Sequence, residues 1–274
     1  MNLIQSEIPA SPTGRHNPQS KIPPEVVLPP HAKSAVFRYQ GKKVVGILNR
    51  PRGPQDKKFP AVLFLHGFPG SEKNVDIQRE LLKRGIASYA MNFCGAWGSE
   101  GLYRFSKLTD QAVAGFRFLR SQPFVEGQRM AVFGLSMGGW TAIHLGKREP
   151  LLKAVVAVAS VGGPEMIGEN TRNLLADLSV PLRIGSSSAL YADFVKAVRQ
   201  QDPAQSVLQI KCPLLLVHGE ADEVVPSSIS ERIYAAAHQP KELIRVPQGS
   251  HAFLERREWL TGLVSDWLQK KLSS

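Results

Sequence analysis

The order of hydrophobic and polar segments along the chain predicts a parallel β-sheet covered by helices. After residue 60, short apolar runs of strand length alternate with longer amphipathic stretches, and this alternation is typical of α/β proteins. The expected strands are residues 61–65, 86–93, 130–135, 154–159, 214–217 and 243–246. The expected helices are residues 72–84, 107–121, 137–148, 227–238 and 252–271.

Two further segments precede this alternation. Residues 35–39 and 43–48 predict the strands of a hairpin, joined by a turn that contains a glycine. The first 30 residues hold seven of the twenty prolines and show almost no periodic pattern, which is the composition of an extended arm. We therefore expect a proline-rich N-terminal arm over residues 1–34 and one folded domain over residues 35–274.

One interval breaks the regular spacing of the strands. About fifty residues separate the strand that ends near residue 159 from the next one, and an insertion of this length is usually functional. Helix-like patterns at residues 164–178 and 189–198 predict a small helical cap over about residues 161–212. Seven apolar residues of the cap are candidates to roof a site below it: Met166, Ile167, Leu174, Leu175, Leu190, Tyr191 and Phe194.

Composition narrows the class of protein. A chain of 274 residues with 43% hydrophobic residues can build one sizeable core. Cys94 and Cys212 are too few for a disulfide framework and lack the paired spacing of a zinc site, so we interpret them as free thiols. No apolar run reaches the ~18 residues that a membrane span needs, and the N-terminus lacks the apolar core of a signal peptide. A cytoplasmic protein without a membrane partner is expected.

The net charge of +11 is concentrated near the N-terminus. Residues 1–60 hold ten Lys and Arg against three Asp and Glu, whereas the remaining residues hold 24 against 20. The body of the chain contains no motif of a nucleic-acid-binding fold. We therefore predict no nucleic-acid partner, and the oligomeric state stays open.

The strongest local signal is a Gly-x-Ser-x-Gly motif centred on Ser136. A buried strand runs directly into the motif, and a helix follows it, as in the nucleophile elbow of a serine hydrolase. Side chains at Gly134 and Gly138 would collide with the neighbouring strand and helix, so both positions need glycine. We predict that Ser136 is the nucleophile, with the Met137 amide at the helix N-terminus stabilising negative charge.

A serine hydroxyl needs a base that is oriented by a third group. His251 lies in the loop after the last expected strand, and Asp222 lies just beyond the end of the preceding one. The chain order Ser, Asp, His is that of the strand-to-helix elbow enzymes. Glu220 and Glu223 are the alternatives to Asp222. None of the other histidines lies in a loop after the last expected strand, and we assign them packing or loop-ordering roles.

The strand that ends at residue 65 is followed by His66, Gly67 and Phe68. This turn would direct the Phe68 amide at the site, where it partners the Met137 amide as an oxyanion donor. We expect His66 to order the loop rather than act as a base. A turn of three hydroxyls at residues 186–188 has no base nearby in the sequence, and we interpret it as a helix N-cap region.

Five segments in the expected order resemble the α/β-hydrolase superfamily, over about residues 35–272. They are residues 66–68, 92–101, 134–139, 218–222 and 249–251. Within the superfamily the chain is similar to prolyl-oligopeptidase-like and cinnamoyl (feruloyl) esterases. Relatives commonly carry Arg where this chain has Cys94. The resemblance implies an α/β-hydrolase fold, with a mostly parallel eight-stranded sheet, helices on both faces and a small cap.

The expected function is that of a serine esterase for short acyl or compact aromatic esters. Ser136 would attack the carbonyl carbon, His251 would take the serine proton, and water would then release the acid from an acyl-enzyme. The chemistry needs no metal and no cofactor, and the only expected partner is a small-molecule ester substrate. Two alternatives stay open, a small peptidase or amidase with the same triad and a catalytically silent binding module.

Overall fold

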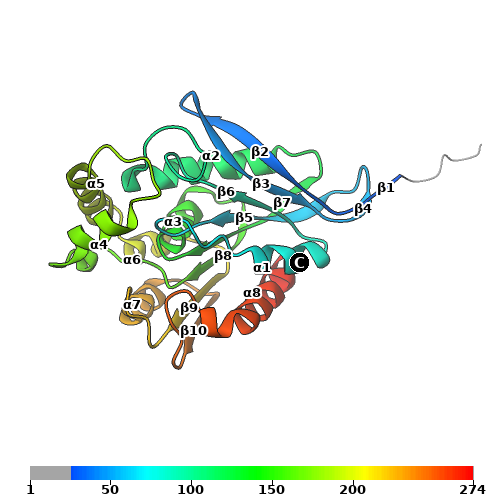
Figure 1. The fold of residues 1–274 in the computed structure, drawn as a ribbon. Coiled ribbons are helices and arrows are strands. Elements are labelled where there is room, and N and C mark those ends of the chain that lie inside the picture. Colours follow the sequence, from blue (N-terminus) through cyan, green and yellow to red (C-terminus); the bar gives the residue numbers. More distant parts are fainter. Residues whose placement is uncertain (1–25, 274) are drawn as a thin grey trace, which may run out of the picture.

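An eight-stranded sheet forms the centre of the molecule in the computed structural model, which describes residues 26–273 (Figure 1). The strands follow one another across the sheet in the order β10-β9-β8-β7-β5-β6-β3-β2. The six strands from β10 to β6 run parallel, and β3 and β2 continue the sheet in antiparallel pairing. The strands are β2 (His31–Tyr39), β3 (Lys42–Arg50), β5 (Phe59–Leu65), β6 (Ala87–Met91), β7 (Val125–Leu135), β8 (Leu152–Val158), β9 (Leu214–Gly219) and β10 (Lys241–Val246).

Helices cover both faces of the sheet, as the alternating pattern predicted. Helices α1 (Val75–Lys83) and α8 (Arg257–Leu272) contact each other on one face. Helices α2 (Leu108–Arg120), α3 (Met137–Arg148) and α7 (Ser228–Ala236) pack into the hydrophobic core on the other face. The fold is therefore the expected α/β-hydrolase arrangement.

Each central strand contributes side chains to two hydrophobic cores, one on either face. In β7, Val132 belongs to the core beneath α2 and α3, whereas Ala131 and Phe133 belong to the core beneath α1 and α8. All three residues are completely buried. Burial on both faces explains why these strands are continuous apolar runs in the sequence rather than alternating ones.

The start of the domain differs from the expected boundary. Residues 1–25 of the predicted arm lie outside the described residues. The rest of it contains strand structure, because β2 begins at His31 and β1 (Val27–Leu28) pairs with β4 (Gly53–Pro54). The hairpin is thus longer than its apolar pattern, since ladder hydrogen bonds continue across polar residues at its open end.

Two helices begin later than their periodicity predicted. Helix α1 begins at Val75 because Asn74 has a left-handed backbone, with φ of 51°. Helix α8 begins at Arg257 because Phe253 is left-handed, with φ of 54°, and a 3-10 turn, η4 (Leu254–Arg256), follows it. Left-handed residues interrupt the right-handed helix, and hydrophobic spacing alone does not reveal them.

The interval between β8 and β9 forms the helical cap. Its elements are η2 (Pro164–Met166), α4 (Thr171–Leu178), α5 (Ser187–Gln200), α6 (Pro203–Ser206) and η3 (Val207–Gln209). The single helix expected over residues 164–178 is divided, because the chain turns at Gly168, whose N–H donates to Thr171 Oγ1. Figure 1 shows α4 and α5 at one end of the sheet. Within residues 26–273, no helix is both long and apolar enough to cross a membrane.

Candidate active site

Ser136 occupies a sharp turn between β7 and α3. Strand β7 ends at Leu135, α3 begins at Met137, and Ser136 between them has φ of 58° and ψ of −121°. A Cβ atom on Gly134 would collide with the carbonyl oxygen of Gly138, and one on Gly138 would collide with that of Leu65. The steric reason predicted for the two motif glycines is confirmed.

Backbone hydrogen bonds hold the turn in place. The Ser136 N–H donates to Val158 O at 2.8 Å, and the Ser136 carbonyl accepts from Val161 N at 3.3 Å and from Trp140 N at 3.1 Å. The Met137 amide lies in the first turn of α3, where amide groups have no partner within the helix. The turn therefore presents a hydroxyl and a helix N-terminus together, which is the pairing that acyl transfer requires.

The structure brings His251 and Asp222 into direct contact. His251 Nδ1 lies 2.8 Å from Asp222 Oδ2. The other carboxylate oxygen, Oδ1, accepts from the amides of Val224 and Val225, both at 2.8 Å. Since a carboxylate only accepts hydrogen bonds, Nδ1 carries the proton and Nε2 is left unprotonated in the neutral ring. This is the tautomer that a general base needs.

Close packing fixes the two loops that carry these residues. The Ala221 N–H donates to Gly249 O at 3.0 Å, and the Glu220 N–H donates to Val246 O at 2.9 Å. A Cβ atom on Gly219 would collide with Gly249 O. The glycines before Asp222 and before His251 thus allow the ends of β9 and β10 to approach each other.

Asp222 is ionised in spite of its burial. Its side chain has no exposed surface, and burial alone would raise its pKa. Hydrogen bonds from His218, His251 and the Val225 amide, together with the charge that His251 carries when it is protonated, outweigh burial and hold the pKa of Asp222 well below its usual range. Glu220 and Glu223 are exposed, and Glu220 lies 3.7 Å from Arg245. Of the three carboxylates weighed from the sequence, Asp222 is the one paired with His251.

His218 is a second hydrogen-bond partner of Asp222, and the sequence interpretation missed it. Its Nε2 lies 3.2 Å from Asp222 Oδ2 and 2.9 Å from Val225 O, and both oxygens are acceptors. Nε2 therefore carries a proton, and Nδ1 faces Ser230 Oγ at 2.6 Å. The available signal was its position at the end of a buried strand, four residues before Asp222, whereas the sequence pattern indicated only a packing or loop-ordering role.

The loop after β5 passes directly beside the serine. A Cβ atom on Gly67 would lie 3.1 Å from Ser136 Cβ, so only glycine backbone fits there without displacement. His66 Nδ1 donates to Gly67 O at 2.7 Å, and its Nε2 accepts from Phe93 N at 3.2 Å. Burial lowers the pKa of His66 to about 3, so the ring is neutral at pH 7. Its contacts order the loop that carries Phe68.

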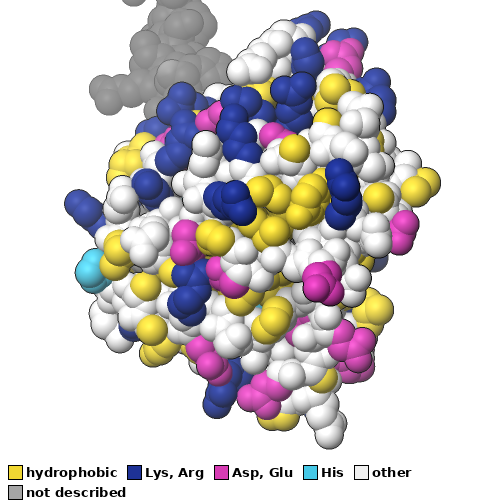
Figure 2. All heavy atoms as spheres, turned by 90° about the vertical axis from the view of Figure 1, so that its left-hand side faces the viewer, with side chains coloured by type: hydrophobic (Ala, Val, Ile, Leu, Met, Phe, Trp, Pro, Cys, Tyr) yellow, Lys and Arg dark blue, Asp and Glu magenta, His cyan; other side chains and the backbone are white. Residues whose placement is uncertain are grey.

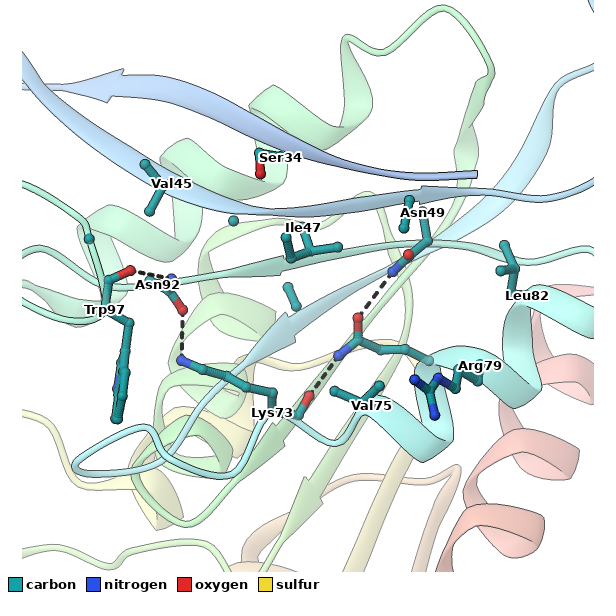
Figure 3. A pocket seen from close by; sticks show the side chains of 15 residues that line it. Ser34, Val45, Ile47, Asn49, Lys73, Val75, Arg79, Leu82, Asn92 and Trp97 are labelled. Carbon is teal, nitrogen blue, oxygen red and sulfur yellow. Dashed lines mark hydrogen bonds between the residues drawn. The ribbon is translucent and has the colours of Figure 1, made fainter. Parts of the chain in front are cut away.

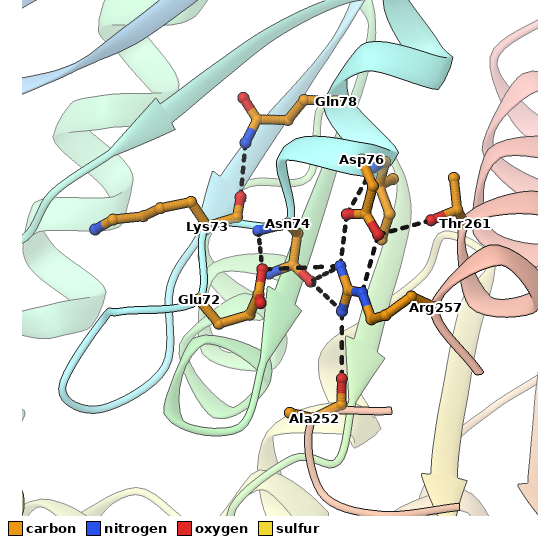
Figure 4. Close-up of polar contacts among 9 residues, drawn as sticks. Glu72, Lys73, Asn74, Asp76, Gln78, Ala252, Arg257 and Thr261 are labelled. Atoms are coloured by element: carbon orange, nitrogen blue, oxygen red, sulfur yellow. Dashed lines mark hydrogen bonds and ion pairs between the residues drawn. The ribbon is translucent and has the colours of Figure 1, made fainter. Parts of the chain in front are cut away.

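Arg257 connects the histidine loop to the start of α1 (Figure 4). Its guanidinium pairs with both oxygens of Asp76 and donates to Asn74 Oδ1 at 3.3 Å. It also donates to Ala252 O at 3.3 Å, next to His251. Burial opposes the charge on Asp76, but the Arg257 contacts lower the pKa of Asp76 overall. The backbone that follows His251 is thereby tied to the body of the domain.

Ser136 and His251 line one cavity of about 690 Å³. Four of the seven roof candidates also line it, and Ile167, Leu190 and Tyr191 do not. Its apolar lining includes Phe68, Phe105, Met166, Leu174, Leu175 and Phe194. Figure 2 shows the face at the α4 and α5 end, where hydrophobic side chains gather near the middle, with Lys and Arg mostly above and Asp and Glu mostly below.

The remaining candidate groups take structural positions. Ser186 is the N-cap of α5 and accepts from Ala189 N at 3.1 Å, as predicted. His144 Nδ1 lies 2.8 Å from Ser206 Oγ, and burial lowers its pKa to about 3. Cys94 and Cys212 are free thiols whose pKa values are raised by burial. The described residues contain no group of three or more His, Cys, Asp or Glu arranged to hold a metal.

Fold and site together define a serine hydrolase of the α/β-hydrolase type. The profile of the prolyl oligopeptidase family, Peptidase_S9, matches residues 96–274, and the chain belongs to that family. The YfhR protein of Escherichia coli (strain K12) is 29% identical over 74% of this chain and 68% of its own length. The uncharacterized peptidase YtmA of Bacillus subtilis (strain 168) is 27% identical over 78% of this chain and 83% of its own.

A solved structure shows the same fold. Est1E from Butyrivibrio proteoclasticus, determined with ferulic acid bound, superposes with a TM-score of 0.74 at 20% identity. The superposition covers 88% of this chain and all of Est1E. At this level of identity the likeness concerns the fold.

Proposed function

We propose that the protein is a serine esterase that cleaves short acyl or compact aromatic esters through an acyl-enzyme. The observation that carries the proposal is the 2.8 Å contact between His251 Nδ1 and Asp222 Oδ2, at a cavity that Ser136 and His251 share. Ser136 is the nucleophile, His251 the base, and Asp222 the group that orients the base. The amides of Phe68 and Met137 are the oxyanion donors.

The reaction has two steps. Ser136 Oγ attacks the carbonyl carbon while His251 Nε2 takes the serine proton, and the oxyanion is stabilised by the two amides. His251 then gives the proton to the leaving alcohol as the carbon–oxygen bond breaks. In the second step His251 activates water, which releases the acid and restores Ser136.

The cavity supports a compact substrate. A space of about 690 Å³ lined by phenylalanine, leucine and methionine side chains accommodates a small acyl group or one aromatic ring with its substituents. The ferulic acid bound to Est1E is a ligand of this kind in a protein of the same fold. Each added methylene would contribute about 0.8 kcal/mol until the acyl chain outgrows the cavity.

An activity panel tests the proposal. We expect kcat/KM on p-nitrophenyl esters to rise from acetate to butyrate and to fall near about C6 to C8, with methyl ferulate also cleaved. The control is the Ser136→Ala variant, which should be inactive on every ester. Peak turnover on C12 to C16 esters with activation at an oil–water interface would reassign the protein as a lipase.

A peptidase or amidase is the second candidate, because the family is that of prolyl oligopeptidase and the same triad cleaves amides. Glu165 and Glu169 also line the cavity, and none of the Lys or Arg residues that the structure describes lines it. Glu165 is paired with Arg232, so the free amine of an aminoacyl substrate would meet mainly the carboxylate of Glu169. An aminoacyl anilide measured beside the esters separates the two. A lack of turnover on both substrate classes, with no labelling of Ser136 by a fluorophosphonate, would favour a binding module.

A further inference from the structure

A second cavity of about 680 Å³ lies on the outer face of β2, β3 and β6, beside the start of α1 (Figure 3). Neither Ser136 nor His251 lines it. Its wall comes from β2, β3 and β6, from α1 and the loop before it, and from the loop after β6. The lining residues are Ala32, Ser34, Val45, Gly46, Ile47, Asn49, Lys73, Val75, Gln78, Arg79, Leu82, Ala90, Asn92, Trp97 and Gly98.

The middle of this cavity is apolar and open. Val45, Ile47 and Ala90 project from neighbouring strands, and register pairs Ile47 with Ala90. Ile47 is 45% exposed, and Val75 and Trp97 at the rim are 46% and 43% exposed. Large hydrophobic side chains that gather around a hollow while remaining this exposed are typical of ligand sites.

The charges of the two cavities are opposite. Among the described residues that line the second cavity, the only charged ones are Lys73 and Arg79, which are both basic. The active-site cavity instead contains Glu165 and Glu169. An anionic ligand is therefore attracted to the second cavity. At the first cavity the charge of Glu165 is paired with Arg232, and Glu169 adds a further negative charge.

Lys73 has donors that its protein contacts leave unused. Its Nζ donates to Asn92 Oδ1 at 2.7 Å and lies 5.2 Å from the centre of the Trp97 ring. An ammonium group has three donors, and among residues 26–273 only Asn92 is found as an acceptor. Burial lowers the pKa of Lys73 to about 8, so the amine is still mostly protonated at pH 7. Two N–H groups remain for an acceptor.

The surroundings of Lys73 are ordered by hydrogen bonds. Gln78 Nε2 donates to the Lys73 carbonyl at 2.6 Å, and Asn49 Nδ2 donates to Gln78 Oε1 at 3.1 Å. Figure 3 shows Lys73 directed towards Asn92 and Trp97, with Arg79 at the other end of the apolar wall. The lysine is thus held at one end of the cavity before any ligand arrives.

We propose that this cavity binds a small amphipathic carboxylate at a site separate from the active site. The carboxylate accepts two hydrogen bonds from Lys73 Nζ. Its apolar body lies over Val45 and Ile47, in the direction of Arg79. An ion pair with a partly buried ammonium gives the orientation, and contact with the strand face provides the hydrophobic contribution.

Calorimetric titration of the full-length protein tests the proposal with a matched pair of probes. The probes are naphthalene-2-carboxylate and 2-naphthamide, which share the apolar body and differ in charge. We expect the carboxylate to bind at least tenfold more tightly than the amide. Lys73→Met should remove this preference, and Ile47→Glu, which places a carboxylate at an exposed position of the wall, should abolish carboxylate binding.

The control variant is Lys270→Gln, which removes one positive charge from the exposed side of α8 and should leave both affinities unchanged. Equal affinity for the two probes, or full carboxylate affinity in both cavity variants, would overturn the proposal. So would carboxylate binding that occurs only after deletion of residues 1–25, because the chain itself would then be the occupant. Self-association that Ile47→Glu disperses would make the face an interface between copies instead.

Discussion

Replacing Asp222 by Asn isolates the role of the carboxylate, since the two side chains have nearly the same shape. In the wild type, Oδ1 accepts from the amides of Val224 and Val225, while Oδ2 accepts from His218 Nε2 and His251 Nδ1. An asparagine has one oxygen and one NH2 group. If its oxygen stays with the two backbone amides, its NH2 group faces two imidazole N–H donors.

The expected consequence is a change in the His251 tautomer. To accept from the asparagine NH2 group, His251 must lose the proton on Nδ1 and carry it on Nε2, where it cannot take a proton from Ser136. By analogy with the Ser-His-Asp template, kcat should fall by about 10⁴, which corresponds to about 5.5 kcal/mol of transition-state stabilisation. KM should change little, because Asp222 does not line the cavity.

The assay is steady-state hydrolysis of the best p-nitrophenyl ester, with Glu220→Gln and Glu223→Gln as matched controls. Both control residues are exposed and lie within two positions of Asp222, so their substitution should change kcat less than about threefold. A kcat for Asp222→Asn within tenfold of the wild type would refute the reasoning. A loss at Glu220 comparable to that at Asp222 would move the orienting acid upstream.

We also predict that the difference in unfolding free energy between the wild type and Asp222→Asn depends on pH. The pKa of Asp222 is lowered in the folded state, so its contribution is fully present above the unfolded-state pKa near ~3.9. The contribution is lost as the pH falls through the lower folded-state pKa. Urea unfolding should therefore show a stability difference between wild type and Asp222→Asn that is constant near neutral pH and shrinks below about pH 4.

Three further predictions concern other parts of the chain. Ser136→Ala should abolish ester hydrolysis, while its urea unfolding midpoint should equal that of the wild type within experimental error. A fluorophosphonate should label the wild type at Ser136 alone. Labelling in residues 186–188 would contradict the assignment of the nucleophile. Arg257→Met should lower the free energy of unfolding by about 1–3 kcal/mol and also reduce kcat, because Asp76 and the histidine loop lose their partner. The control is Arg256→Met, which changes an exposed position. An equal effect of the control variant would contradict the reasoning. Deletion of residues 1–25 should leave kcat/KM unchanged, since the described site draws on none of them, and a loss above tenfold would show that they contribute to it.

The sequence by itself predicted the class of fold and the proposed nucleophile, Ser136, because both predictions rest on signals within short segments of the chain. Buried strands of a parallel sheet are continuous apolar runs whatever their neighbours are, so their number and their order along the chain could be predicted from the sequence. The elbow could be predicted because the Gly-x-Ser-x-Gly motif directly follows an apolar strand and precedes a helix. The contact that requires Gly134 is local, with Gly138 O, whereas Gly138 is required by Leu65 O of the neighbouring strand β5. The superfamily followed from these motifs and their order, and the family match agrees with it.

Only the tertiary structure decided which groups act on one another across the ends of the strands. Three carboxylates lie within four positions of the chain at residues 220–223, and the close approach of β9 and β10 selects the one that reaches His251. The contact of His218 with the same carboxylate likewise depends on the path of the loop after β9, because the Val225 carbonyl of that loop also accepts from His218 Nε2.

The second cavity is likewise a product of the assembled sheet. Lys73 and Ile47 are far apart in the sequence and carry no motif, so nothing local relates them. Strand pairing places the β3 side chain beside β6, and the loop before α1 then brings the lysine to the same hollow. Hydrophobic periodicity records whether a side chain is buried, whereas contacts between distant segments depend on register and loop geometry, which no single segment encodes.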